Sequence, residues 1–301
     1  MHFDFDLGIA LAGLIVGVVV GMTGMGGGAL MTPILVIGFG IEPLAAVSSD
    51  LVASVIMKPI GGGIHFRRGT VHTGLVRWLA LGSVPGALLG SYWISHLSGD
   101  VGDTIKTVLG VVLLIAAVAM LVRWYLSGHR PTGVEGADAE RVPVKRVATL
   151  AVGLIGGIVV GMTSVGSGSL MIVALMLMYP MLSTRELVGT DLVQAVPLVA
   201  AAALGHLIWG EFVFGLTGSL LIGSIPGVII GAHISTRAPE AFIKPVLALV
   251  LSLTALKLLG VSNEMLLGIL VASIVAGTVT FFVRRRRLPA EPLAESLADY
   301  P

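Results

Sequence analysis

The stretch GMTGMGGGALM, residues 21–31, interrupts a long hydrophobic run near the amino terminus. Five of its first eight residues are glycine, which permits tight turns and leaves backbone N–H groups uncovered by side chains. If the run lies in a bilayer, such non-helical backbone is tolerated only where it is buried in protein or lines a wet cavity. The stretch therefore predicts a membrane segment that is broken at a protected place.

The composition of the whole chain supports a membrane location. Of its 301 residues, 55% are hydrophobic and 12% are charged, against about a quarter charged in soluble domains. Several apolar runs reach the roughly 20 residues that cross a bilayer as a helix. We therefore expect an all-α integral membrane protein in contact with lipid. The chain has no cysteine, and we expect no cofactor, no metal and no nucleic-acid partner.

A second copy of the opening stretch, GMTSVGSGSLM, occupies residues 161–171. Further matches follow in the same order, at a spacing of 140 and then 141 residues: Asp50 matches Asp191, His65 matches His206, and GSVPGALLG at 82–90 matches GSIPGVIIG at 223–231. Chance does not explain so many matches in register. The chain is therefore an internal duplication.

Each copy contains two short apolar segments followed by three long ones. In the first copy they cover about 7–22, 29–39, 44–66, 73–96 and 104–126, and in the second about 147–162, 169–179, 186–207, 212–235 and 241–259. We predict a helical bundle of two transmembrane repeats, 7–126 and 147–260, each with a glycine-tipped, broken or re-entrant hairpin and three long helices. An additional helix covers 262–283. A solvated, flexible linker, 127–146, and a tail, 284–301, are both expected in the cytoplasm.

The distribution of Lys and Arg predicts the orientation, because these residues concentrate in short cytoplasmic loops. A topology with the amino terminus outside and the linker and carboxyl terminus inside puts most of them on the cytoplasmic side. Each copy then crosses the membrane an odd number of times. We therefore expect inverted repeats in a multi-pass protein of the cell membrane, as in secondary transporters.

The short segments predict where a ligand binds. At about 16 and 11 residues they span roughly 24 and 17 Å, too short to cross comfortably, so each pair enters and leaves by one face. The second arm is expected to begin at Gly28 or Gly168. Two inverted hairpins can meet at the midplane, where free N–H groups and hydroxyls form an anion site. The candidate residues are Thr23, Gly24, Gly26, Gly27, Gly28, Thr163, Ser164, Gly166, Ser167, Gly168 and Ser169.

The buried ionisable residues have two interpretations each. Lys58 either holds an anion or extends its amine to the membrane surface. Asp50 and Asp191 either relay protons or cap broken backbone. His65 and His206 either respond to pH or are stabilised by a helix carboxyl end. The spacing by four of six further glycines predicts close helix packing: Gly13, Gly17, Gly21, Gly153, Gly157 and Gly161.

Together, the duplicated glycine-rich hairpins, the paired aspartates and the paired GS-x-PG segments resemble the sulfite exporter TauE/SafE family, also called the toluenesulfonate uptake permease family, over about residues 11–259. The resemblance implies secondary transport of sulfite, thiosulfate, sulfoacetate or another organosulfonate, in a direction that differs among members. The family's glycine motif falls on residues 24–28 and, less closely, on 166–169. In the second copy, Ser164 and Ser167 stand where the first has Gly24 and Gly27.

The preferred hypothesis is therefore a transporter and not an enzyme: a small sulfur-containing anion moves by alternating access, with proton coupling. Alternatives are an anion channel and an intramembrane aspartyl protease, in which two acids share a proton. However, Gly189-Thr190-Asp191 lacks the glycine before aspartate that GxGD proteases have, and Val165 stands where the GxSG pattern of rhomboid proteases needs glycine. The anion, the direction, the coupling ion and the oligomeric state stay open.

Overall fold

A computed structural model describes residues 5–23, 27–96, 101–129, 133–134, 136–234 and 240–273. The chain divides into two units, Met1–Gly260 and Val261–Pro301. In the second unit the described part contains a helix over Asn263–Ser273. The first unit contains both copies of the duplication.

The first unit is helical, and its element order repeats as predicted. Its described residues form no strand, and their two β-bridges are isolated. Five described helices are long and apolar enough to cross a membrane, so the expectation of an all-α membrane protein is confirmed. The elements are α1 (Leu7–Thr23), α2 (Gly28–Pro33) with the π-helix η1 (Ile34–Gly38), α3 (Pro43–Arg67), α4 (Thr73–Ser95), α5 (Val101–His129), the 3-10 helix η2 (Gly136–Arg141), α6 (Arg146–Thr163), α7 (Leu170–Met178), α8 (Thr184–Trp209), α9 (Phe214–Ile234) and α10 (Glu240–Leu258).

Three of the long helices begin at side chains that accept a backbone hydrogen bond. Glu42 accepts from the N–H of Ala45 at the start of α3. His72 accepts from the N–H of Leu75 at the start of α4, and Ser183 accepts from the N–H of Glu186 at the start of α8. Such caps satisfy N–H groups that a helix leaves without a partner in its first turn. They fix where each long helix enters the bundle.

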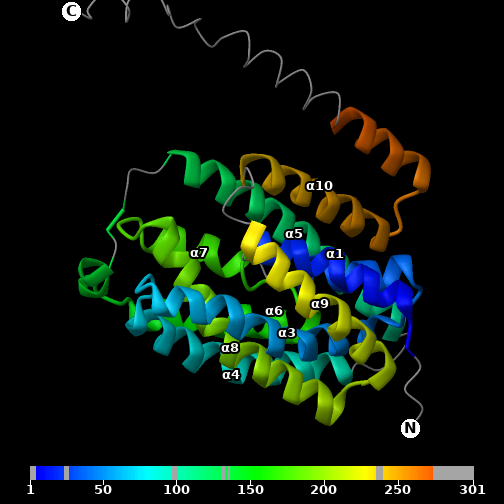
Figure 1. The fold of residues 1–301 in the computed structure, drawn as a ribbon, viewed down its shortest axis with the longest axis horizontal. Coiled ribbons are helices and arrows are strands. Elements are labelled where there is room, and N and C mark those ends of the chain that lie inside the picture. The colour runs from blue at the N-terminus through cyan, green and yellow to red at the C-terminus, as the bar shows by residue number, and fades with distance from the viewer. Residues whose placement is uncertain are drawn as a thin grey trace, which may run out of the picture. The chain divides into compact units, whose positions relative to one another are not determined.

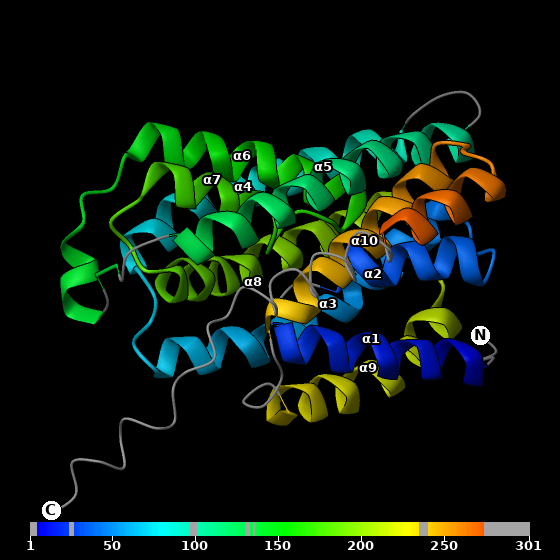
Figure 2. The ribbon, with the colours of Figure 1, turned by 90° about the horizontal axis from the view of Figure 1, so that it is seen from above.

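The first helix of each copy packs against the fourth helix of the other copy. Figure 2 shows α1 beside α9 and α6 beside α4. The glycines make this approach possible, since a Cβ at Gly157 would collide with Ser83 and one at Gly161 with Ala87 on α4. Gly13 and Gly17 lie equally close to the backbone of α9, and Gly153 to Leu79. Close packing is therefore confirmed for these five glycines.

Replacing Gly157 by valine is expected to destabilise the bundle. The new side chain meets the backbone of α4, which cannot move aside as a flexible side chain would, and overpacking costs about 1–3 kcal/mol. Thermal unfolding of the purified protein measures the loss. The matched control is Ile155→Val on the same helix, where the side chain is 64% exposed. Equal unfolding temperatures for the two variants would contradict the packing role.

The third helices of the two copies, α3 and α8, lie against each other in opposite directions. Ser48 near the start of α3 contacts His206 near the end of α8, whereas Gly62 near the end of α3 lies against Leu192 in the first half of α8. The fifth helices also pair, and Figure 1 shows α10 along α5. The third and fifth helices of each copy thus contact the corresponding helices of the other copy.

The described part of the linker between the copies is mostly exposed, as expected of a solvated segment, but specific contacts attach it to the helices. In its described part, Ala139 on η2 is fully buried and Glu140 accepts a hydrogen bond from the N–H of Thr73. The N–H of Gly136 donates to Glu186 on α8, and Val134 exchanges backbone hydrogen bonds with Met181 and Ser183. The sequence missed this because the segment lacks large apolar residues. Its attachment depends on polar contacts with residues distant in the chain.

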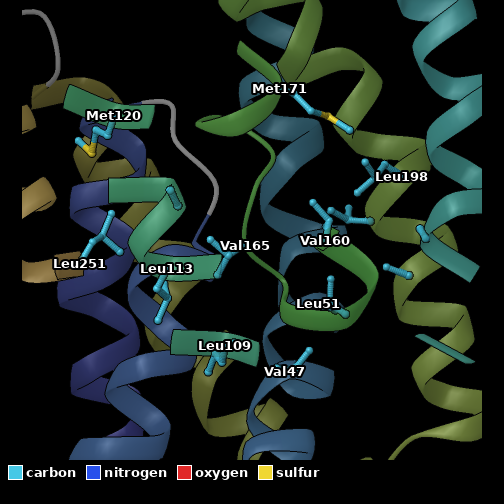
Figure 3. Packing of buried hydrophobic residues seen from close by; sticks show 14 of the residues in the cluster. Val47, Leu51, Leu109, Leu113, Met120, Val160, Val165, Met171, Leu198 and Leu251 are labelled. Carbon is cyan, nitrogen blue, oxygen red and sulfur yellow. The ribbon is translucent and has the colours of Figure 1, made fainter. Parts of the chain in front are cut away.

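The largest apolar cluster surrounds the turn between α6 and α7. Figure 3 shows Val165 of this turn together with Leu109 and Leu113 of α5 and Leu51 of α3. Val165 is 1% exposed, so the turn is anchored inside the protein. The polar residues beside Val165 are thereby held at a fixed depth between α3, α5 and α8.

Candidate functional site

The second glycine-rich turn, residues 164–169, is buried along its whole length. Its backbone has positive φ angles at Ser164 (60°), Gly166 (131°) and Gly168 (89°). The two glycines adopt such angles at little cost. Serine does so less readily, so the side chain of Ser164 must contribute something that a glycine would not.

The first turn contacts the second. Residues 24–26 lie outside the described residues, as does the side chain of Thr23, so the predicted roles of Thr23, Gly24 and Gly26 have no structural description. Gly27 and Gly28 are both buried. A Cβ on Gly28 would collide with the carbonyl group and hydroxyl of Ser164. The two glycine-containing turns therefore touch, through positions 28 and 164.

Three backbone N–H groups at the start of α7, which the sequence analysis expected to be free, have a hydrogen-bond acceptor. The second arm begins at Leu170 and not at Gly168, and the N–H groups of Ser169, Leu170 and Met171 all lie within 3.0–3.4 Å of the carbonyl oxygen of Gly166. The positive φ of Gly166 turns this carbonyl under the first turn of α7. An anion at this turn would have to compete with this carbonyl for these three N–H groups.

Asp50 lies at the contact between the turns. Its side chain is fully buried, and Oδ2 accepts hydrogen bonds from the hydroxyls of Ser164 (2.6 Å) and Thr32 (3.2 Å). These donors come from the second turn and from α2, the arm of the first hairpin. Oδ1 has no hydrogen-bond partner among the described residues and faces Gly27, where a Cβ would lie 3.5 Å away. Asp50 thus joins both hairpins through one of its two oxygens.

Lys58 supplies the positive charge of the site. Among the residues whose burial is described, it is the one lysine or arginine with a buried side chain, 7% exposed. Its Nζ donates to the hydroxyl of Ser167 in the second turn. The charges of Asp191 and Asp50 both act on Lys58. Asp191, from α8, also accepts a hydrogen bond of 3.0 Å from Gln194. The structure therefore brings Lys58, Ser167 and both predicted aspartates into one buried cluster.

Two further predicted hydroxyls differ in what they can do. Thr163 donates to the carbonyl of Val159 one turn earlier and accepts from the N–H of Val165, so it stabilises the end of α6 and does not face the cluster. The hydroxyl of Ser169 is buried and has no hydrogen-bond partner among the described residues. A buried hydroxyl without a partner is costly. Ser169 is therefore suited to bind a ligand that brings an acceptor.

The two predicted histidines occupy different environments. His206 is fully buried: its Nε2 donates to the carbonyl of Gly161 (2.7 Å) and its Nδ1 lies 2.8 Å from the hydroxyl of Ser48. His65 lies at the end of α3, partly exposed, with Nδ1 2.9 Å from the hydroxyl of Thr70. His206 therefore lies in the bundle interior next to the site, whereas His65 lies at the end of α3 and contacts the loop between α3 and α4.

Sequence reasoning missed Thr32, Ser48 and Gln194. Gln194 stands three residues after Asp191 on one helix, a spacing at which side chains meet, so a search for polar neighbours of the aspartates could have found it. Thr32 lies in an apolar arm and had no such signal. The described residues contain no group of three His, Cys, Asp or Glu side chains that could hold a metal ion.

The fold and this site define a multi-pass helical membrane protein whose buried polar centre is built from two glycine-containing turns and the third helix of each copy. The comparisons with known proteins agree with that class. The family model described as "Sulfite exporter TauE/SafE" matches residues 9–258. The chain therefore belongs to the sulfite exporter TauE/SafE family.

The curated relatives come from Bacillus subtilis and are named as transporters. The chain is 39% identical to "Probable membrane transporter protein YjnA" over 259 residues, 84% of this chain and 100% of the relative. It is 23% identical to "Probable membrane transporter protein YdhB", over 83% of this chain and 99% of the relative. It is 29% identical to "Probable membrane transporter protein YtnM", over 74% of this chain and 72% of the relative. No solved structure matches the chain.

Proposed function

We propose that the protein is a secondary transporter that moves a small sulfur-containing anion, such as sulfite, thiosulfate or an organosulfonate, by alternating access with proton coupling. The family description and the relatives' names support transport. The observation that carries the proposal is the buried cluster at the contact of the two turns. There, Lys58 offers a positive charge, and Ser167 and Ser169 offer hydroxyls.

The charge of the cluster fits an anion that is bound and released. Lys58 neutralises part of the negative charge of Asp50 and Asp191, so an entering anion competes with the two carboxylates for the same ammonium group. Anion binding is therefore balanced against the attraction between Lys58 and the two carboxylates, and a site that must also release its ligand needs this balance. A permanently unpaired cation would hold the anion too tightly for turnover.

The arrangement of the copies supports alternating access. The duplicated third helices α3 and α8 run in opposite directions through the site, as inverted repeats require. The exchanged packing of α1 on α9 and of α6 on α4 gives two similar halves that can rock about the central pair. We place the repeats at 7–126 and 147–260, the linker at 127–146, a further helix at 262–283 and the tail at 284–301.

The proposed orientation in the membrane keeps the amino terminus outside and the carboxyl terminus in the cytoplasm. In this orientation the linker contacts lie on the cytoplasmic side. There, Lys145 lies over the ring of Tyr179 and Arg146 over that of Trp78. Aromatic rings and cationic side chains both favour the membrane interface, and the positive charges match the inner leaflet.

His206 is suited to proton coupling because its surroundings accept both of its charge states. The carbonyl of Gly161 can only accept, so Nε2 always carries a hydrogen. When the ring is neutral, the hydroxyl of Ser48 donates to Nδ1. When the ring is protonated, Nδ1 donates to that hydroxyl, which turns to the carbonyl of Leu44, 2.8 Å away. We place His206 and Asp191 beside Asp50 on the proton route, and His65 at its cytoplasmic end.

Uptake into proteoliposomes tests the proposed function. Vesicles containing the protein and an imposed pH gradient are expected to take up labelled thiosulfate, with saturation and with accumulation above the external concentration. Protein-free vesicles and excess unlabelled sulfate are the controls. An anion channel instead gives flux that only follows the electrochemical gradient of the anion. No flux of any sulfur oxyanion or sulfonate would overturn the proposal.

A further inference from the structure

The two oxygens of Asp50 have different surroundings, and this difference carries an inference that rests on the proposed function. Oδ2 is occupied, because Ser164 and Thr32 both donate to it. Oδ1 is as deeply buried but has no hydrogen-bond partner among the described residues. A buried acceptor without a partner is expensive, and more so when it is charged. Oδ1 therefore needs either a proton or a donor from a ligand.

Thiosulfate or a sulfonate, which carries no proton near neutral pH, does not bring that donor. Its oxygens accept hydrogen bonds, so an ionised carboxylate and the anion repel each other at the contact of the turns. A proton on Oδ1 removes the repulsion and turns the oxygen into a donor. The resulting O–H group faces Gly27, at the first turn, beside the flexible side chain of Met57.

The backbone of Ser164 indicates why a serine occupies this place. Its φ of 60° is one that glycine adopts most easily, and the equivalent position of the first copy is indeed glycine, Gly24. The serine keeps the unfavourable backbone and supplies the hydroxyl that holds Oδ2 from the opposite hairpin. Thr32 does the same from the first hairpin. The two hydroxyls thus fix the carboxyl group so that Oδ1 faces the turn.

The other ionisable groups around Asp50 come from two helices. Lys58 lies two turns further along α3, Asp191 acts on the same lysine from α8, and His206 of α8 contacts Ser48. The described parts of α1, α2, α7 and residues 164–169 contain no ionisable side chain. With both aspartates ionised, the group of Lys58, Asp50 and Asp191 has one excess negative charge. One proton makes the group neutral before the anion arrives.

We propose that Asp50 takes up one proton on Oδ1 together with the anion and donates it as a hydrogen bond to an oxygen of the bound anion, while Thr32 and Ser164 act as positioning residues that hold Oδ2. The proton comes from water on the side from which the anion enters. It binds one lone pair of Oδ1, and it leaves to water on the other side once the anion has gone. Proton and anion therefore bind cooperatively, which is the linkage that coupled transport requires.

Binding of thiosulfate and of methanesulfonate to the purified protein tests the proposal, because neither ligand changes its own protonation between about pH 5 and pH 8. Isothermal titration in buffers of different ionisation enthalpy is expected to show an uptake of about one proton per anion. In the pH range where this proton is taken up, the Kd is expected to decrease by up to about tenfold for each pH unit of acidification.

Three variants separate the roles. Asp50→Asn keeps an uncharged side chain with an N–H donor, so it is expected to bind the anion with a Kd that no longer depends on pH. Thr32→Val and Ser164→Gly each remove one donor that favours the charged carboxylate. They are expected to move the pH range of the Kd change upward, whereas a purely structural role would weaken binding equally at every pH. The control is Thr254→Val, whose hydroxyl bonds its own helix.

The outcomes distinguish the inference from the proposed function. A wild-type protein that binds either anion with a Kd independent of pH, or without proton uptake, overturns the inference and leaves anion transport standing. Full pH dependence in Asp50→Asn overturns it as well. Binding of neither anion at any pH would remove the proposed function itself. If Asp50→Asn does not fold, the wild-type proton count and the two hydroxyl variants still decide the question.

Discussion

Replacing Gly28 by alanine is expected to abolish most transport, whereas the same change at a glycine with open space beside it is not. A Cβ at position 28 collides with the carbonyl group of Ser164, and that backbone is fixed by the burial of Val165 and by the turn geometry at Gly166. Overpacking of about 1–3 kcal/mol corresponds to a shift of about 5- to 150-fold in an equilibrium between two arrangements. The two turns must separate, and the site between them opens.

The control for Gly28→Ala is Gly63→Ala on α3. A Cβ at Gly63 meets nothing within 4 Å, and alanine is the better helix former, so this variant is expected to keep transport and gain slight stability. Uptake into proteoliposomes and thermal unfolding are measured for both. Equal uptake by the two variants would contradict the tight contact of the turns.

Replacing Lys58 by glutamine is expected to weaken anion binding by about 10- to 150-fold, the loss of one hydrogen bond to a charged group of about 1.5–3 kcal/mol. Lys58 is the buried cation of the cluster, and its removal also leaves Asp50 and Asp191 without their shared positive charge. The anion then meets two carboxylates and no compensating ammonium group. Titration with thiosulfate at a single low pH measures the change.

Two controls separate charge from folding. Lys58→Arg keeps the charge and is expected to bind the anion more tightly than Lys58→Gln, although the guanidinium does not fit the place of an ammonium group. Lys106→Gln removes an exposed lysine that pairs with Asp103 and is expected to leave binding unchanged. If Lys58→Gln were folded and bound thiosulfate as the wild type does, Lys58 would have no part in the anion site.

The sequence predicted the elements of the fold well. The two short and three long segments of each copy coincide with helices within about three residues, the limit at which such boundaries are meaningful. Apolar length and the spacing of glycines are local properties, and a duplication shows each of them twice. Spacing also distinguished the packing glycines from the turn glycines. A spacing of four places Gly13 and Gly17 on one helix face, whereas the glycines within residues 24–28 are too closely spaced to favour a helix.

The candidate site was predicted in part. Asp50, Lys58, Ser164 and Ser167 were all candidates, and they do lie together, but the sequence could not show which pairs form. Asp50 and Ser164 are 114 residues apart and Lys58 and Ser167 are 109 apart. Pairing over such distances depends on how the copies pack. Free N–H groups at the start of the second arm were predicted, but the carbonyl of Gly166 accepts from those of Ser169, Leu170 and Met171.

By itself the sequence determined that this is a duplicated helical membrane protein with two glycine-rich interruptions, because hydrophobic length, charge distribution and repetition can be read one segment at a time. Only the tertiary structure decided that the interruptions touch, that one buried oxygen of Asp50 has no hydrogen-bond partner among the described residues, and that Lys58 lies among the charges of both copies. The reason is physical: a side chain buried in a bundle must satisfy its hydrogen bonds and its charge with whatever the neighbouring helices bring, and packing alone chooses those neighbours.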